Sequence, residues 1–301
     1  MSSYIVKLAG QAINLAGLVS PRTAGRMAFR LFSSTHAPEP ANGKAKRLYE
    51  ISQTQMRQAE KLLLPVPDGH VASHHFPPIG QASGKRYLVV HGWGSRIDYM
   101  QPLITALRQT GAAIVGLDLP GHGGSTGRVL TVPMAIDAVD AAWRQYGDFD
   151  AMIGHSFGGF VSAMAAAGPE DWVTRRTPGK LVLIAAPVAA KHVFDGYAGM
   201  MGFTSRVHRA MESQAGAIVG RPIDFFEADG MLATVPDLPV LVLHAEDDKE
   251  VSARAARRYA SAGPQVKLQW MNGLGHRRIV NSPAVIEAVK DFLASAAGNV
   301  S

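Results

Sequence analysis

A serine between two glycines stands where a short apolar run meets a helical pattern. The run ends in Gly154-His-Ser156-Phe-Gly158, and small residues suited to a buried helix follow over 160–167. Where a strand turns sharply into a helix, the two nearly touch two residues before and after the turn, so only glycine fits there. The turn exposes the serine hydroxyl, and the helix N-terminus offers N–H groups to a developing negative charge. A plain turn before a buried helix gives the same pattern, so a nucleophilic serine requires partners elsewhere in the chain.

A serine hydroxyl is a weak nucleophile until a base takes its proton, and a third group must orient that base. Among the eleven histidines, His276 lies in a loop after the last predicted strand. His91 and His155 stand inside short motifs where side chains pack, His244 ends a buried strand, and the histidines before residue 90 precede the core strands. The loop after the 239–244 strand carries four acidic residues that could orient the base: Glu246, Asp247, Asp248 and Glu250.

These residues stand at the ends of apolar segments that alternate with helical patterns. Short strands begin at Val71, and further strands are predicted over 87–91, 112–118, 150–154, 180–186, 239–244 and 266–271. Helical patterns cover 97–110, 132–146, 160–167 and 283–297. Buried strands that alternate with helices of about a dozen residues predict an α/β fold. We therefore expect a doubly wound, mostly parallel sheet with flanking helices.

Two segments fall outside this alternation. Residues 1–65 form a predicted N-terminal helical arm, with helices over 4–19, 24–32 and 45–64 and a Pro/Ala/Gly linker over 33–44. The α/β core is predicted over 66–187 and 239–301. Residues 188–238 interrupt it, and their helical patterns are rich in Met and Phe. Such an insertion predicts a helical lid over the carboxyl edge of the sheet, although its apolar residues could also pack a small core of their own.

The first helical segment is apolar but carries Lys7, Gln11 and Asn14, and no clear small-residue cleavage site follows it. An amphipathic helix is therefore predicted rather than a signal peptide. It either packs on the domain or lies on a membrane surface. No segment approaches the roughly 20 apolar residues of a membrane span. We expect a cytoplasmic protein whose N-terminal segment could allow peripheral membrane contact.

Composition excludes several classes of function. The 301 residues include no cysteine, which rules out disulfides, thiolate zinc sites and cysteine nucleophiles. The formal net charge of +6 is spread along the chain, whereas nucleic-acid binding needs basic residues clustered on one element. His70, His74 and His75 invite a metal site, but no carboxylate cluster accompanies them, so strand and loop positions are expected instead.

Five motifs in this order resemble the α/β-hydrolase family over roughly residues 70–297. They are His91-Gly-Trp-Gly94, Asp118-Leu-Pro-Gly-His-Gly-Gly-Ser125, Gly154-His-Ser-Phe-Gly158, His244-Ala-Glu-Asp-Asp248-Lys-Glu-Val251 and Gly273-Leu-Gly-His276. The resemblance implies a sheet with flanking helices and the chain order Ser, Asp, His for a catalytic triad. Residues 1–65 lie outside it.

The resemblance assigns a role to each triad member. Ser156 is implied as nucleophile and His276 as base, while the family's pattern after the 239–244 strand puts the acid at Asp248, with Asp247 next. Ala245 replaces the glycine of that pattern. Some relatives carry the acid after the preceding strand, but Ala185-Ala186-Pro187 offers no carboxylate there.

By the same resemblance, the backbone N–H groups of Trp93 and Phe157 form the oxyanion hole. The implied function is a serine hydrolase that cleaves a carboxylic ester with an apolar acyl or alcohol part through an acyl-enzyme. No metal, organic cofactor or nucleic acid is implied. His91-Gly-Trp-Gly94 differs from the His-Gly-Gly-Gly of one lipase branch, and a serine at position 156 argues against dehalogenases and epoxide hydrolases. Acyl transfer, C–C bond hydrolysis and cofactor-free haloperoxidation remain alternatives, and a non-catalytic binder is disfavoured because all three triad residues are present.

Overall fold

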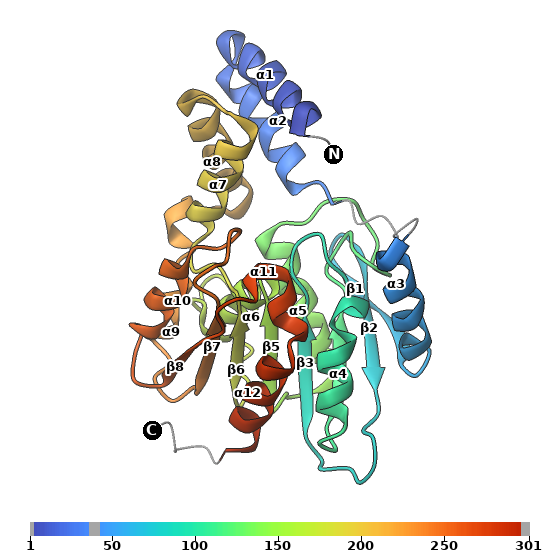
Figure 1. Cartoon of the computed structure of the whole chain (residues 1–301). Helices are drawn as coiled ribbons and strands as arrows, with labels where there is room; N and C mark the ends of the chain where they lie inside the picture. The colour runs from blue at the N-terminus through green and yellow to red at the C-terminus, as the bar shows by residue number, and fades with distance from the viewer. Residues whose placement is uncertain (1–2, 36–42, 296–301) are drawn as a thin grey trace. The chain divides into compact units, whose positions relative to one another are not determined.

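The computed structural model describes residues 3–35 and 43–295 and contains an eight-stranded sheet (Figure 1). The strands are β1 (Glu60–Val66), β2 (Gly69–Phe76), β3 (Arg86–Val90), β4 (Ala113–Leu117), β5 (Ala151–His155), β6 (Leu181–Ile184), β7 (Val240–His244) and β8 (Val266–Trp270). Their order across the sheet is β1-β2-β4-β3-β5-β6-β7-β8. β2 runs antiparallel to both β1 and β4, and all other neighbours are parallel. The predicted mostly parallel, doubly wound sheet is confirmed.

The described residues divide into two compact units. The sheet unit comprises Thr35–Val188 and the chain from Ala228 onward. The helical unit combines the chain up to Ser34 with Ala189–Glu227.

Helices cover both faces of the sheet. In the sheet unit they are α3 (Gly43–Met56), η1 (Ile97–Met100), α4 (Gln101–Arg108), α5 (Val132–Tyr146), α6 (Phe157–Ala167), α9 (Ala228–Leu232), α10 (Ala253–Ala260), α11 (Gly275–Arg278), η3 (Ile279–Asn281) and α12 (Pro283–Ala294). α4 and α12 lie in front of the sheet in Figure 1, and α5 and α6 lie behind it. Because side chains alternate along a strand, Val89, Ile153 and Leu241 share the core under α4 and α12.

The prediction of one helix is wrong in part. The pattern over 45–64 predicts a helix throughout, but α3 ends at Met56 and β1 begins at Glu60. Leu62 to Leu64 form a short apolar run that fits a helix or a strand equally well, and its antiparallel pairing with β2 decides the outcome. The expected arm 1–65 is also divided, since α3 and β1 belong to the sheet unit.

The helical unit consists of α1 (Ser3–Val19), α2 (Pro21–Ser33), α7 (Ala190–Met201), α8 (Ser205–Val219) and η2 (Ile223–Phe225). Ser20 separates the first two helices and caps α2 by accepting a hydrogen bond from the Thr23 N–H at 3.3 Å. The core of the unit joins both chain segments: Ile13 and Phe29 pack with Phe194, Val207 and Met211. The inserted apolar residues therefore share a core with the N-terminal helices. No helix among the described residues is long and apolar enough to cross a membrane.

Candidate active site

Ser156 lies at the sharp turn between β5 and α6. Its φ of 52° places it in the left-handed region, which a non-glycine residue seldom occupies. The predicted steric demand on the flanking glycines is met. A Cβ at Gly154 would overlap the backbone of Gly159, and a Cβ at Gly158 would overlap the carbonyl oxygens of Val90 and His91. The two glycines let the strand, the helix and the neighbouring strand approach closely enough to hold this backbone.

The structure brings the predicted nucleophile, base and acid together. His276 Nε2 lies 2.9 Å from Ser156 Oγ, and His276 Nδ1 lies 2.8 Å from Asp248 Oδ2. Because an ionised carboxylate only accepts hydrogen bonds, Nδ1 carries the proton and Nε2 is left to accept from the serine hydroxyl. Ser156 and Asp248 follow β5 and β7, whereas His276, predicted in a loop, lies in the short helix α11 after β8. The three strands are parallel and end at the same edge of the sheet.

Asp248 is held in its ionised form by its surroundings. Burial alone would raise the pKa of this carboxyl, but the hydrogen bond to His276 and the Val251 and Glu250 N–H groups outweigh burial and lower it. Asp248 Oδ1 accepts from the N–H groups of Glu250 at 2.8 Å and Val251 at 2.9 Å. One carboxylate oxygen therefore fixes the loop, and the other faces His276.

The other acidic residues of this loop have different partners. Asp247 accepts a hydrogen bond from the Gly273 N–H at 2.7 Å, and Glu246 pairs with Arg257 at 2.7 Å. Glu250 pairs with Arg277 at 2.8 Å, and its second oxygen lies 3.9 Å from His276 Nε2. Of the four carboxylates, Asp248 is the one within hydrogen-bond distance of His276 Nδ1.

His155, expected to serve packing, holds the backbone of the predicted base. Its Nε2 donates to the His276 carbonyl oxygen at 2.9 Å, and the two rings lie 5.1 Å apart. Burial lowers the pKa of His155 to about 4, so the ring is neutral at physiological pH. Its partner is a backbone carbonyl 121 residues away, which no sequence spacing indicates.

Two further histidines fix the loop that carries Trp93. His91 Nε2 accepts from the Leu119 N–H at 3.0 Å and its Nδ1 donates to the Gly92 carbonyl at 2.7 Å. His122 Nε2 accepts from the Gly94 N–H at 3.0 Å. Burial lowers the pKa of His91 to about 4 and also lowers that of His122. Both rings must be neutral, since each accepts a hydrogen bond through a ring nitrogen.

Asp118 connects this loop to the sheet. Its buried carboxylate bonds to His74 Nε2 at 3.0 Å and accepts from the N–H groups of Ile97 at 3.0 Å and Gly124 at 2.9 Å. Burial would raise the pKa of Asp118, but the hydrogen bonds from His74 and from the Gly124 N–H lower it to about 2. His74, one of the three histidines that invite a metal site, is thus a hydrogen-bond partner of a structural carboxylate.

Trp93 and Phe157 lie together beside Ser156. Their rings are 5.2 Å apart and nearly perpendicular. Phe157 is the first residue of α6, where N–H groups have no partner within the helix. The loop passes close to the serine, because a Cβ at Gly92 would lie 2.9 Å from Ser156 Cβ. These positions suit the predicted oxyanion donors.

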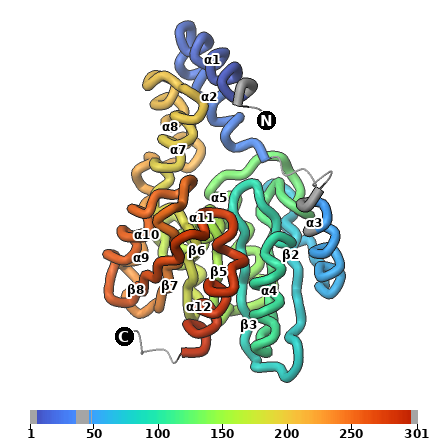
Figure 2. Tube along the Cα trace, viewed as in Figure 1, coloured from blue at the N-terminus to red at the C-terminus, as the bar shows by residue number. Residues whose placement is uncertain are grey.

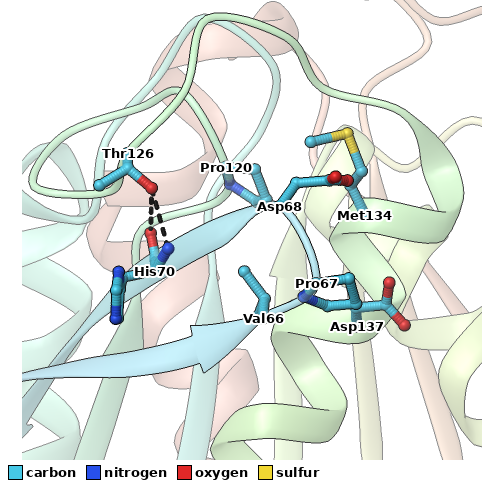
Figure 3. A pocket seen from close by; sticks show the side chains of 8 residues that line it. All are labelled: Val66, Pro67, Asp68, His70, Pro120, Thr126, Met134 and Asp137. Carbon is cyan, nitrogen blue, oxygen red and sulfur yellow. Dashed lines mark hydrogen bonds between the residues drawn. The ribbon is translucent and has the colours of Figure 1, made fainter.

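Two surface hollows lie elsewhere. One, between the β1–β2 turn and the start of α5, has a volume of about 10 Å³, roughly one water molecule. Figure 3 shows His70 and Thr126 hydrogen-bonded to each other at its wall. The other is an open hollow of about 460 Å³ lined by residues 212–223 of the helical unit. Neither is lined by Ser156, Asp248 or His276, so we do not assign the substrate to them.

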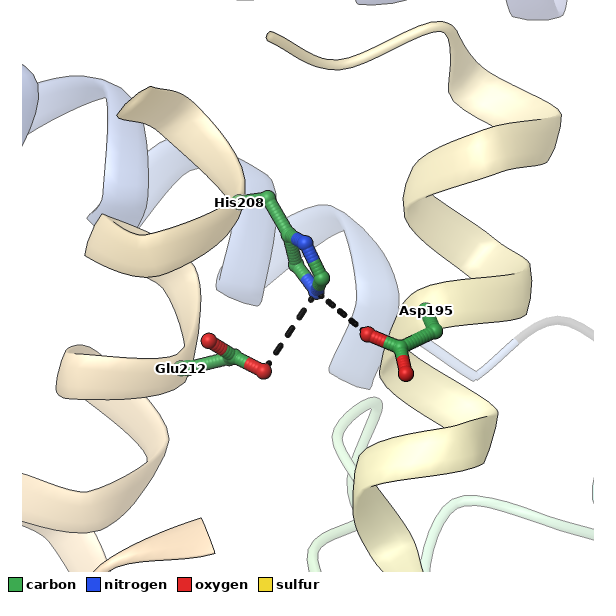
Figure 4. A group of neighbouring side chains, drawn as sticks. All are labelled: Asp195, His208 and Glu212. Carbon is green, nitrogen blue, oxygen red and sulfur yellow. Dashed lines mark ion pairs between the residues drawn. The ribbon is translucent and has the colours of Figure 1, made fainter. Parts of the chain in front are cut away.

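In the part of the chain that the structure describes, one group of side chains has the composition of a metal site. Asp195, His208 and Glu212 place their ligand atoms within 4.8 Å of one another (Figure 4). The Lys191 ammonium lies 2.9 Å from Glu212 Oε1 and 3.5 Å from Asp195 Oδ1. Because Lys191 already supplies a positive charge to both carboxylates, the group is an ion-pair network between α7 and α8.

Comparisons with known proteins agree with this architecture. A model of the alpha/beta hydrolase family matches residues 87–289. The comparison with curated proteins gives no match. Among solved structures, the esterase Pf2001 of Pyrococcus furiosus has a TM-score of 0.62 at 15% identity, covering 88% of this chain and 98% of that one.

Two further solved structures are similar at comparable identity. A membrane phospholipase A described as a bacterial virulence factor has a TM-score of 0.58 at 17% identity, covering 83% of this chain and 91% of that one. A putative lipase (lip1) of Acinetobacter baumannii AYE has a TM-score of 0.57 at 18% identity, covering 84% and 98%. At such identities the likeness shows the fold alone.

Proposed function

Because the chain belongs to the alpha/beta hydrolase family, we propose that it is a serine hydrolase that cleaves carboxylic esters through an acyl-enzyme. Its fold is the α/β-hydrolase fold expected from the sequence. The observation that carries the proposal is the unbroken series of hydrogen bonds from Ser156 through His276 to Asp248. Esterases and lipases among the structural neighbours are consistent with it.

In the first half of the proposed reaction, Ser156 Oγ attacks the ester carbonyl carbon as its proton passes to His276 Nε2. Asp248 accepts the Nδ1–H bond and stabilises the imidazolium that forms. The tetrahedral intermediate then breaks the bond to the alcohol oxygen, and His276 returns the proton to the departing alcohol. Ser156 is left as an ester of the acyl group.

In the second half, His276 takes a proton from water, and the resulting hydroxide-like oxygen attacks the acyl carbon. Collapse of the second intermediate releases the carboxylic acid, and Ser156 regains its proton. In each half, the negative oxygen is proposed to accept hydrogen bonds from the Trp93 and Phe157 N–H groups. Loss of one such donor typically costs about 10²–10³ in rate.

The substrate is proposed to be a small ester with an apolar acyl or alcohol part. Residues 188–238 remain our proposed lid, and the cytoplasmic location remains a prediction. A series of p-nitrophenyl esters of rising chain length tests the lid. Equal rates from acetate to long chains would contradict a role for the insertion in substrate selection.

Covalent labelling followed by turnover tests the proposed function. A fluorophosphonate should add once to the protein, as measured by intact mass, and the label should map to the peptide containing Ser156. Labelling should disappear in Ser156→Ala and fall sharply in His276→Ala, because an unassisted serine hydroxyl hardly reacts. Ser261→Ala is the matched control: that exposed hydroxyl donates to the Arg258 carbonyl, and its loss should leave labelling unchanged.

Turnover by the wild-type protein separates the alternatives. Hydrolysis of a short-chain ester supports an esterase. A protein that takes the fluorophosphonate label, but releases the acyl group of an ester only when an alcohol or thiol acceptor is added, is an acyltransferase. Folded wild-type protein that resists the reagent would rule out the serine mechanism.

A further inference from the structure

Helix α1 is apolar on the side that packs against the rest of the helical unit. Three residues at helical spacing face that side. A Cβ at Gly10 would overlap the Met201 carbonyl, Ile13 is buried, and a Cβ at Gly17 would lie 2.7 Å from a methyl group of Val207. Asn14 satisfies the adjoining backbone, donating to the Gly202 carbonyl at 2.8 Å and accepting from the Thr204 N–H at 2.9 Å. This side of α1 is fully explained by packing within the unit.

The outward side of α1 carries exposed aliphatic residues beside the exposed Gln11, and no described residue buries them. Leu8, Leu15 and Val19 follow one another at spacings of seven and four residues, which places them on one side of the helix. Their exposed fractions are 46%, 66% and 89%, and the adjacent Leu18 is 70% exposed. A surface helix ordinarily turns polar residues outward, so a row of exposed aliphatic side chains marks an interaction surface.

The same pair of helices carries an unbalanced positive charge. Residues 3–33 contain no Asp or Glu and four cations: Lys7, Arg22, Arg26 and Arg30. The three arginines repeat every four residues along α2 and are exposed. None of the four forms an ion pair with another described residue. α1 and α2 pack against each other within the helical unit and lie side by side in Figures 1 and 2.

We propose that this surface, Leu8, Leu15, Leu18 and Val19 of α1 with the cations Lys7, Arg22, Arg26 and Arg30, binds the face of an anionic lipid bilayer. Interfacial helices insert aliphatic side chains at the level of the head groups and keep Lys and Arg near the phosphates. A protein partner could cover an aliphatic row, but a helix pair with four cations and no acidic residue is complementary in charge to a uniformly negative surface. The proposal does not depend on the proposed esterase activity.

Vesicle flotation with the full-length Ser156→Ala protein tests binding without any hydrolysis of the lipid. The protein should float with vesicles in which about a third of the lipid is phosphatidylglycerol and stay largely in solution with pure phosphatidylcholine. Binding should weaken strongly at about 1 M NaCl, where the Debye length falls to roughly 3 Å. Protein that remains in solution with the anionic vesicles at low salt would overturn the proposal.

Substitutions within the surface locate the binding. Arg22→Gln/Arg26→Gln/Arg30→Gln should lower the partition coefficient on anionic vesicles by roughly 100-fold, because each cation near the surface contributes about fivefold. Leu8→Gln/Leu15→Gln/Val19→Gln should lower it at least tenfold, since three aliphatic side chains no longer enter the interface. All six positions are exposed, so circular dichroism and thermal unfolding should show that both variants remain folded.

Matched controls come from the sheet unit. Arg47→Gln/Arg57→Gln/Arg254→Gln removes the same charge from other exposed positions, and Leu63→Gln removes a leucine that is 53% exposed. Both should bind almost like the parent protein. If the control variants lose as much binding as the surface variants, the surface does not bind bilayers. The same conclusion follows if the parent protein is a dimer by light scattering and Leu8→Gln/Leu15→Gln/Val19→Gln abolishes that dimer.

Discussion

At the scale of single residues, two neighbouring carboxylates provide the sharpest test of the proposed acid. Asp248 accepts from His276, whereas Asp247 accepts from the Gly273 N–H. Asp248→Asn should lower kcat for a short-chain ester by about 10⁴, because an amide can hold the wrong histidine tautomer. Asp247→Asn should lower it less than about tenfold, since only a loop contact is weakened. Reversed effects in proteins of equal thermal stability would assign the acid to Asp247.

His155 gives a second prediction at this scale, as a positioning residue for His276. His155→Ala should lower kcat by roughly 10- to 100-fold, because small displacements of a catalytic group carry costs of this size, and should leave KM nearly unchanged. His155→Gln keeps an N–H donor for the His276 carbonyl and should restore most of the activity. An equal loss in both variants would mean that the ring acts through packing alone.

The sequence was sufficient to name the residues that meet at the site but not all that hold them. Ser156, His276 and Asp248 stand in local patterns that resemble those of a known family, and that resemblance was needed to choose Asp248 among the four acidic residues of its loop. His155, His91 and His122 act through single hydrogen bonds to backbone atoms of distant segments. Such bonds depend on the folded path of the chain, and nothing in the neighbouring residues signals them.

At the scale of elements, the turn between β5 and α6 can be tested through its glycines. Gly154→Ala should destabilise the protein by several kcal/mol or prevent folding, since the new methyl group would overlap the Gly159 backbone. Gly196→Ala is the matched control. Gly196 lies in α7, and no other side chain or distant backbone comes within 4 Å of the place an alanine methyl group would take, so alanine should stabilise by about 0.5–1 kcal/mol. Urea unfolding of both variants measures the difference, and similar stability in the two would contradict the steric account.

Elements with strong periodicity were predicted well, and a short apolar run was not. α5 has the predicted bounds, Val132–Tyr146, because a threonine cap and Pro133 mark its start and Gly147 its end. Leu62 to Leu64 instead became strand, since the partner strand β2 determines the structure of so short a run. The grouping of α1 and α2 with residues 189–227 was not foreseen, because it rests on contacts between segments more than 150 residues apart.

At the scale of the whole molecule, buried ionisable groups predict how stability depends on pH. His91 and His155 have ordinary pKa values of 6.5 that fall to about 4 in the folded protein. Between these values the unfolded chain binds more protons, so the free energy of unfolding decreases as pH falls from 6.5 to 4, by up to about 3 kcal/mol per histidine. Urea unfolding at pH 7, 5.5 and 4 should show this loss and a smaller one for His155→Gln. Equal losses in both proteins would contradict a neutral, buried His155.

Asp118 affects the free energy of unfolding in a lower pH range. Its folded pKa of about 2 lies below the ordinary 3.8, so it contributes stability above pH 4 that is lost as pH falls towards 2. Asp118→Asn should be less stable at neutral pH, because its partners His74, Ile97 and Gly124 lose a charged acceptor. It should also lose less further stability between pH 4 and 2, and a steeper loss than in the parent protein would contradict the assignment.

The division of the helical unit between two chain segments has a consequence for synthesis on the ribosome. α2 ends at Ser33 and α8 begins at Ser205, so about 170 residues are made between them, which takes roughly 10–35 s at usual translation rates. Three residues of α2 are buried in the finished unit: Ala24, Ala28 and Phe29. During that interval they remain exposed, because the helix that covers them has not yet been made. Helices α1 and α2 therefore remain open to chaperones or to a nearby bilayer for longer than any other part of the helical unit.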